Sequence, residues 1–155
     1  MDMETFAQRV EDLRPRLYRT AFCYLESEAA ALDAVDEAVY RGLKSLKKLR
    51  QPEYFDTWMT RILLNECSRE KKRWTRFRPL EDVSELSEAA FDRLPLREAI
   101  QKLPKELKDI VILRFFSGYT QAETAEALEI PQGTVATRQR KALQLLKLDL
   151  EEVEP

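Results

Sequence analysis

The chain has 155 residues, with 26 lysines and arginines, 28 acidic residues and no histidine, which gives a net charge of −2. This length accommodates one domain or two small ones. The cysteines Cys23 and Cys67 form no CxxC pair, and two thiols alone cannot complete a tetrahedral zinc shell. We recognise no signal peptide and no apolar run of about 18 residues. We therefore expect a cytoplasmic protein with buried, reduced thiols, and with neither a metal nor a cofactor.

The charge is distributed unevenly along the chain. Residues 1–40 carry a net charge of −5, residues 41–79 carry +8 and residues 80–131 carry −5. Residues 132–148 then carry +4, and the last seven residues carry −4. Two basic segments in an otherwise acidic chain indicate two places that contact a polyanion, with other segments that avoid it.

Helical periodicity predicts a first helix over residues 5–25 and a second from Glu28 to about Lys48. Ser27 is expected to cap the second helix. Pro15, which has no amide hydrogen, should kink or split the first. The residues that we expect these two helices to bury are Phe6, Val10, Leu13, Leu17, Ala21 and Tyr24, and then Leu32, Val35, Val39, Leu43 and Leu46.

A third helix is predicted over residues 55–73, after a break at residues 51–53. Its inward face contains Phe55, Trp58, Met59, Ile62, Leu63 and Cys67. A polar stripe on the same helix contains Thr57, Arg61, Asn65, Arg69 and Lys72. The basic segment 71–76, with Trp74 inside it, suits a single nucleic-acid strand, because bases stack on aromatic rings and phosphates meet cations. The alternative is an ordinary solvated helix face.

Residues 104–148 carry the motif with the clearest spacing. A helix should end near Gly118, where a left-handed cap is needed. Thr120 and Glu123 form a capping box that begins a short helix, and after a turn Thr134 opens the last helix. This order of elements is that of a helix-turn-helix, whose second helix enters the major groove of DNA.

The last helix has cations and no acid over residues 132–148. Its predicted buried stripe is Val135, Ala142, Leu143 and Leu146. The candidate DNA-contacting residues outside that stripe are Thr134, Thr137, Arg138, Arg140, Lys141 and Gln144. Arginine suits guanine edges, whereas lysine and threonine suit phosphate oxygens. A solvated helix face is the alternative, but such a face normally mixes both signs of charge.

We find no alternating β-strand pattern, so the predicted fold class is all-α. Residues 1–76 form one small helical domain, and residues 94–155 form a second that contains the helix-turn-helix. The acidic segment between them, residues 77–93, contains Ser and Pro and only scattered apolar residues. It is predicted to be a flexible linker.

The ordered set of motifs resembles the small, two-domain extracytoplasmic-function type of bacterial sigma factor, a branch of the sigma-70 family. The resemblance covers almost the whole chain. The matching segments in the first domain are residues 17–21, 33–41 and 55–62 and Asn65. Those in the second domain are residues 103–104, 119–123 and 130–135. Ala136 departs from the family, which often has a cation at this position.

The resemblance implies partners rather than enzyme chemistry. It implies docking of the second helix on the β′ clamp of core RNA polymerase through Asp33, Asp36, Glu37 and Arg41. It implies capture of the unpaired −10 strand by the 49–54 loop and the third helix, through Arg50, Arg61, Asn65, Arg69, Lys72, Arg73 and Trp74. The last helix is implied to read the −35 duplex. The resemblance also implies contact with the β flap, a linker in the polymerase channel and an anti-sigma factor.

Two other functions remain open from the sequence. An ordinary helix-turn-helix regulator would bind a palindromic duplex without polymerase, and the polar stripe around Asn65 argues against it. A helical adaptor that binds only protein would show no salt-dependent affinity for nucleic acid, and the basic stripe argues against that function.

Overall fold

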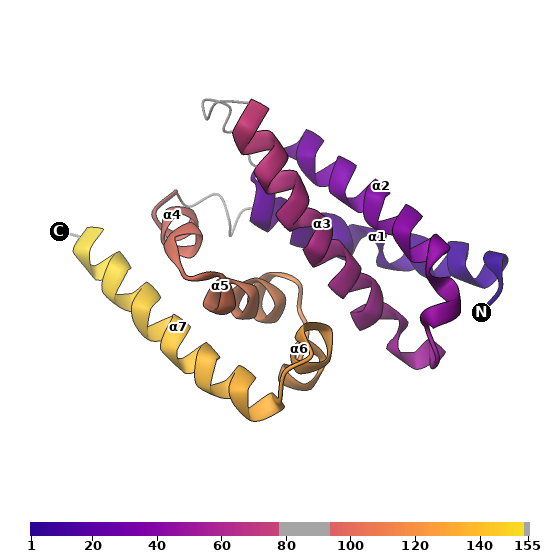
Figure 1. Ribbon diagram of the computed structural model, residues 1–155. Helices are drawn as coiled ribbons and strands as arrows, with labels where there is room; N and C mark the ends of the chain where they lie inside the picture. Colours follow the sequence, from indigo (N-terminus) through magenta and orange to yellow (C-terminus); the bar gives the residue numbers. More distant parts are fainter. Residues whose placement is uncertain (78–93, 154–155) are drawn as a thin grey trace. The chain divides into compact units, whose positions relative to one another are not determined.

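The computed structural model describes the backbone of residues 1–77 and 94–153 and the side chains of residues 1–73 and 95–147 (Figure 1). The described residues form helices and no strand, which confirms the predicted all-α class. The chain divides into two compact units, Met1–Glu85 and Leu86–Pro155. The predicted linker lies outside the described residues apart from Phe77, which ends a helix, and the side chain of Trp74 lies outside them too.

Three long helices make up the described part of the first unit: α1 (Met3–Leu25), α2 (Glu28–Lys44) and α3 (Phe55–Phe77). Each of them packs against the other two. Short 3₁₀ turns at Leu46–Lys48 and Pro52–Tyr54 connect α2 to α3. The predicted second helix is therefore shorter than expected, because the chain changes to a 3₁₀ turn before Lys48.

Local capping explains where the first two helices begin. The Asp2 carboxylate accepts the Thr5 amide at 2.8 Å, and this backbone hydrogen bond lowers the pKa of Asp2 below its ordinary value. The predicted Ser27 cap is confirmed, since its hydroxyl oxygen accepts the Ala30 amide at 3.2 Å. The helix α1 runs through Pro15 and does not split there.

The core of the first unit confirms the predicted stripe of α1, whose six apolar residues are all buried. Phe6 meets Phe55 of α3 edge to face, with ring centroids 5.8 Å apart. The cysteines are free and buried as expected. Thr57, predicted on the polar stripe, is buried instead, and its hydroxyl donates to the Tyr54 carbonyl at 3.2 Å.

The prediction that α2 buries Leu32 is wrong, because the residue is 49% exposed. The buried face of α2 consists of small residues, namely Ala30, Ala31, Ala34, Ala38 and Gly42, together with Val35. A Cβ atom at Gly42 would lie 2.4 Å from the Met59 methyl of α3. Small residues therefore let α2 approach its neighbours closely, and this close packing turns Leu32 to the surface.

The second unit contains α4 (Leu94–Lys102), α5 (Lys105–Val111), α6 (Gln121–Leu128) and α7 (Gln132–Val153). The helix α5 continues as a π-helical turn over Ile112–Phe116. The three shorter helices all pack against α7. A cluster of Ile110, Ala125 and Val135, covered by Leu128 and Ile130, joins α5, α6 and α7.

The helix-turn-helix turn follows the predicted chemistry. Gly118 has a φ of 80°, the left-handed conformation expected at the cap. The capping box is present, with the Thr120 amide donating to Glu123 at 2.9 Å and the Glu123 amide donating to Thr120 at 3.0 Å. The last helix begins at Gln132, two residues before Thr134. The Pro131 carbonyl accepts the Thr134 amide at 3.0 Å.

The turn between α6 and α7 contains a strained residue. Glu129 has a φ of 59°, and this left-handed conformation costs a residue with a Cβ atom about 1–2 kcal/mol. We expect Glu129→Gly to raise the free energy of unfolding by about 1 kcal/mol in urea titrations. Glu26, with a φ of 55° in the first unit, offers the same test, and Glu126→Gly in the middle of α6 is the destabilising control. A loss of stability in Glu129→Gly would contradict this explanation.

Candidate nucleic-acid interface

The outward face of α7 carries the residues predicted to contact duplex DNA. Thr137, Arg140, Lys141 and Gln144 are exposed. Thr134 and Arg138 are half-buried, so the six residues do not contribute equally. The predicted burial of Leu143 is wrong: it is 43% exposed, and Gln139 lies on the inward stripe beside Val135, Ala142 and Leu146 instead.

The cations of α7 differ in how they are held within the protein. Arg138 Nη2 lies 3.8 Å from Glu106 Oε2 of α5, in a partly exposed ion pair. Arg140 and Lys141 have no ion pair among the residues that the structure describes. These two side chains can therefore meet phosphate or a base edge without first leaving a carboxylate.

Arg114 fixes the position of α7 relative to the turn before α6. Its Nη1 donates to the Tyr119 carbonyl at 2.6 Å, and its Nε donates to Gln139 Oε1 of α7 at 2.9 Å. Gln121 Nε2 of α6 donates to the same amide oxygen at 3.3 Å. The sequence did not predict this polar contact, which joins the π-helical turn after α5 to both helices of the helix-turn-helix.

The polar stripe of α3 faces away from its apolar core residues. Asn65, Arg69, Lys72 and Arg73 are exposed, and Arg61 is half-buried. Arg50, in the loop between the two 3₁₀ turns, is exposed as well. These six predicted residues therefore lie along one helix and the loop that precedes it, and five of them are cations whose charge reaches solvent.

Two buried carboxylates lie beneath this stripe and were missed by sequence reasoning. Glu66 is 3% exposed, and its Oε2 pairs with Arg41 Nε of α2 at 2.6 Å and with Arg69 Nη1. Glu70 is 6% exposed and pairs with Arg73 at 3.5 Å. The spacing of three residues along α3 could have indicated two of these pairs, whereas the pair with α2 depends on the tertiary fold.

The predicted polymerase-binding residues lie on the solvent side of α2. Asp33, Asp36 and Arg41 are exposed and Glu37 is half-buried. Asp36 pairs with Arg14 of α1 at 3.4 Å, and Glu37 pairs with Arg41 at 3.4 Å. Two large apolar side chains that were not predicted here, Leu32 and Tyr40, are 49% and 54% exposed on this helix.

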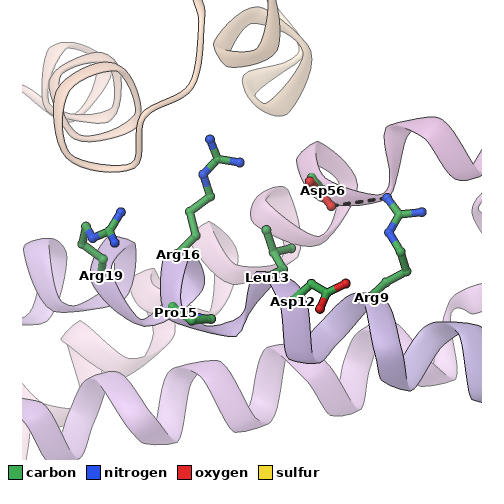
Figure 2. Close-up of a pocket in the computed structure, with 7 residues that line it drawn as sticks. All are labelled: Arg9, Asp12, Leu13, Pro15, Arg16, Arg19 and Asp56. Carbon is green, nitrogen blue, oxygen red and sulfur yellow. Dashed lines mark hydrogen bonds and ion pairs between the residues drawn. The ribbon is translucent and has the colours of Figure 1, made fainter.

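A separate polar pocket of about 450 Å³ lies along α1 and the start of α3 (Figure 2). It is lined by Arg9, Asp12, Leu13, Pro15, Arg16, Arg19 and Asp56. Arg9 Nη2 lies 3.4 Å from Asp56 Oδ1 of α3, and the Arg9 guanidinium lies 4.9 Å from the centre of the Phe55 ring. Because three guanidinium groups and two carboxylates share this open hollow, its charges largely offset one another.

Comparison with known proteins accounts for both units. The model of "Sigma-70 region 2" matches residues 9–77, and that of "Sigma-70, region 4" matches residues 93–146. The chain is 32% identical to the RNA polymerase sigma factor SigV of Bacillus subtilis over 146 residues, which cover 91% of this chain and 88% of SigV. It is 26% identical to the ECF RNA polymerase sigma factor SigW of the same organism, over 98% of this chain and 92% of SigW.

Solved structures share the fold. RpoE from Bartonella quintana, in complex with the anti-sigma factor NepR, has a TM-score of 0.75 and 20% identity, covering 96% of this chain and 98% of that one. CnrH, in complex with the cytosolic domain of CnrY, has a TM-score of 0.77 and 21% identity, covering 99% and 92%.

Two helical units with these matches define a sigma factor, and the chain belongs to the sigma-70 family, on the extracytoplasmic-function branch. It directs RNA polymerase to promoters in transcription initiation, and its partners are core RNA polymerase and promoter DNA. No helix among the described residues is long and apolar enough to cross a membrane.

Proposed function

We propose that the three surfaces divide the work of promoter recognition. The exposed face of α7 reads the −35 element as duplex, and the stripe of α3 with Arg50 captures the unpaired −10 strand. The solvent side of α2 docks on the β′ clamp of core polymerase. In this proposal the protein performs no bond chemistry of its own and acts in the cytoplasm, where the polymerase works.

The observation that carries the α7 assignment is that residues 132–148 contain cations and no acid, on the second helix of a helix-turn-helix. Arg140 and Lys141 are exposed cations on the second helix of the motif, which is the helix that enters the major groove in this class of DNA-binding unit. The Arg114 contact with Gln139 holds that helix against the turn. A fixed helix is required for base reading, because hydrogen bonds to base edges depend on placement.

The α3 assignment is supported by a different mixture of groups. Asn65 offers an amide that can donate and accept, and Arg69 and Lys72 offer charge on the same exposed face. Single strands are bound through phosphate contacts together with polar and stacking contacts to unpaired bases. Capture of strands that leave the duplex would favour the open form of the promoter.

We further propose that an anti-sigma factor controls the protein. RpoE and CnrH, which share its fold, were solved with the anti-sigma factor NepR and with the cytosolic domain of CnrY. Two small helical units offer such a partner exposed surfaces that promoter DNA and polymerase would otherwise use. Competition between purified inhibitor candidates and core polymerase for the labelled protein would test this point.

Run-off transcription with purified core polymerase on genomic fragments tests the overall proposal. We expect initiation at a small set of sites only when the protein is present, and mapping of these starts would supply the −10 and −35 sequences for the experiments below. Duplex binding without initiation would instead favour an ordinary helix-turn-helix regulator, and no salt-dependent binding at all would favour a protein adaptor.

We expect Asn65→Ala to slow promoter opening without loss of duplex binding. The substitution removes one neutral amide, so the expected cost is about 1 kcal/mol, or roughly fivefold. Permanganate footprinting of the holoenzyme–promoter complex measures opening, and a duplex −35 probe measures binding. Gln8→Ala removes an exposed amide from α1 and is the matched control. Equal weakening of duplex binding would contradict the assignment of α3 to the single strand.

A further inference from the structure

One carboxylate joins two of the surfaces described above. Glu66 is 3% exposed on α3 and contacts two arginines through a single oxygen, Oε2. Arg41 reaches this oxygen from α2 at 2.6 Å, and Arg69 reaches it from the next turn of α3. The solvent side of α2, proposed to dock on polymerase, and the polar stripe of α3, proposed to capture the −10 strand, therefore share one buried ion-pair partner.

Burial of Glu66 strengthens its ion pairs with Arg41 and Arg69. An ionised carboxylate removed from water is costly unless it is paired and hydrogen-bonded, so Glu66 holds both guanidinium groups close. The two arginines nevertheless remain at the surface, with side chains that are 47% and 57% exposed. A guanidinium has five N–H donors. Glu66 engages Arg41 through Nε and Arg69 through Nη1, which leaves other donors of each for an external partner.

We propose that Glu66 is a positioning residue, which orients Arg41 toward core polymerase and Arg69 toward the phosphates of the captured strand. This inference rests on the proposed function of the two surfaces. A long side chain that is already ordered loses less conformational entropy on binding, so each arginine binds its partner more tightly when it is held in place. Glu37, which pairs with Arg41 at 3.4 Å, restricts that side chain further.

Electrostatics alone and positioning predict opposite changes in DNA affinity when Glu66 is substituted. Glu66→Gln removes a negative charge near a surface that binds a polyanion, so electrostatics without positioning would raise the affinity for DNA. Positioning predicts a lower affinity, because glutamine keeps the size of the side chain but loses the charged hydrogen bonds. Glu66→Asp keeps the charge and shortens the reach, so it should also weaken binding if position matters.

The experiment measures two affinities for each folded variant. Holoenzyme is titrated with a single-stranded oligonucleotide that carries the −10 sequence of a mapped promoter, and labelled protein is titrated with core polymerase. We expect Glu66→Gln and Glu66→Asp to weaken both by about three- to tenfold. Glu70→Gln, which removes the neighbouring buried carboxylate beside Arg73, is the matched control and should leave polymerase affinity unchanged. Circular dichroism melts confirm folding at the temperature used.

Double-mutant cycles show whether Glu66 acts through the arginines. The effect of Glu66→Gln on the oligonucleotide should vanish in an Arg69→Met background, and its effect on polymerase should vanish in an Arg41→Met background. Unchanged or raised affinities in Glu66→Gln would overturn the inference, as would weakening that persists in those backgrounds. If instead the proposed surfaces do not bind the −10 strand or polymerase, Arg69→Met and Arg41→Met would have no effect by themselves, which distinguishes this case from failure of the Glu66 inference.

Discussion

Arg140→Ala is expected to weaken binding to a duplex −35 element by about 1–3 kcal/mol, the range for an arginine that contacts a base edge. Arg140 is exposed on α7 and has no ion pair among the described residues, so its guanidinium is available in the free protein. The measurement is a fluorescence-anisotropy titration of the holoenzyme with duplex −35 probes. The loss of affinity should be largest for the mapped −35 sequence and small for a scrambled one.

Substitutions of two other cations of α7 are compared with Arg140→Ala for their effect on DNA binding. Lys147→Ala removes an exposed cation from a later turn of α7, so it should weaken all sequences alike and lower the salt dependence by about one phosphate contact. Arg138→Ala should cost less than Arg140→Ala, because binding through Arg138 requires separation from Glu106 at 3.8 Å. If Arg140→Ala weakened specific and scrambled probes equally, Arg140 would contact phosphate rather than a base.

The parts of the fold that could be predicted are those fixed by local chemistry. The Ser27 cap, the Thr120 capping box and the left-handed Gly118 were predicted from short spacings, and all are present. Each needs only neighbours within a few residues to form its hydrogen bonds or to adopt its φ. The apolar stripe of α1 was also predictable, because its large residues repeat with one helical period.

The predictions that were wrong concern residues whose burial depends on packing between helices. Leu32 and Leu143 both satisfy the helical period but face solvent. On α2 the alanines form a competing stripe, and close approach to the neighbouring helices favours them over a leucine. On α7 the inward position next to Leu143 is occupied by Gln139, a polar residue that is accepted because Arg114 donates to it. Periodicity alone cannot show that such a hydrogen-bond partner exists.

The candidate surfaces were predicted by residue type but not by how their charges are paired. The sequence placed Arg41, Arg69 and Arg73 on exposed faces, and all three are exposed. It did not show that Glu66 and Glu70 lie buried beneath them. The pair between Arg41 and Glu66 joins residues that are far apart in the chain, so only the packing of α2 on α3 brings their charges together.

The second large expected effect is a loss of affinity for core polymerase when the exposed apolar residues of α2 are substituted. Leu32 and Tyr40 each lie about one turn from Asp36, on either side of it, and share the solvent side of the helix with the acidic residues. Large apolar side chains ringed by charge are typical of the centre of a protein interface, where a few residues carry most of the binding energy. We therefore propose that they, and not only the carboxylates, contact core polymerase.

Tyr40→Ala is expected to weaken binding to core polymerase by about 2 kcal/mol, or roughly thirtyfold, and Leu32→Ala by about 1 kcal/mol. Neither should change the free energy of unfolding by more than about 0.5 kcal/mol, because both side chains are half exposed in the free protein. Met3→Ala removes an apolar side chain that is 64% exposed at the start of α1, and it should leave polymerase affinity unchanged. A fall in unfolding free energy with unchanged polymerase affinity would mean that Leu32 and Tyr40 pack within the protein rather than against a partner.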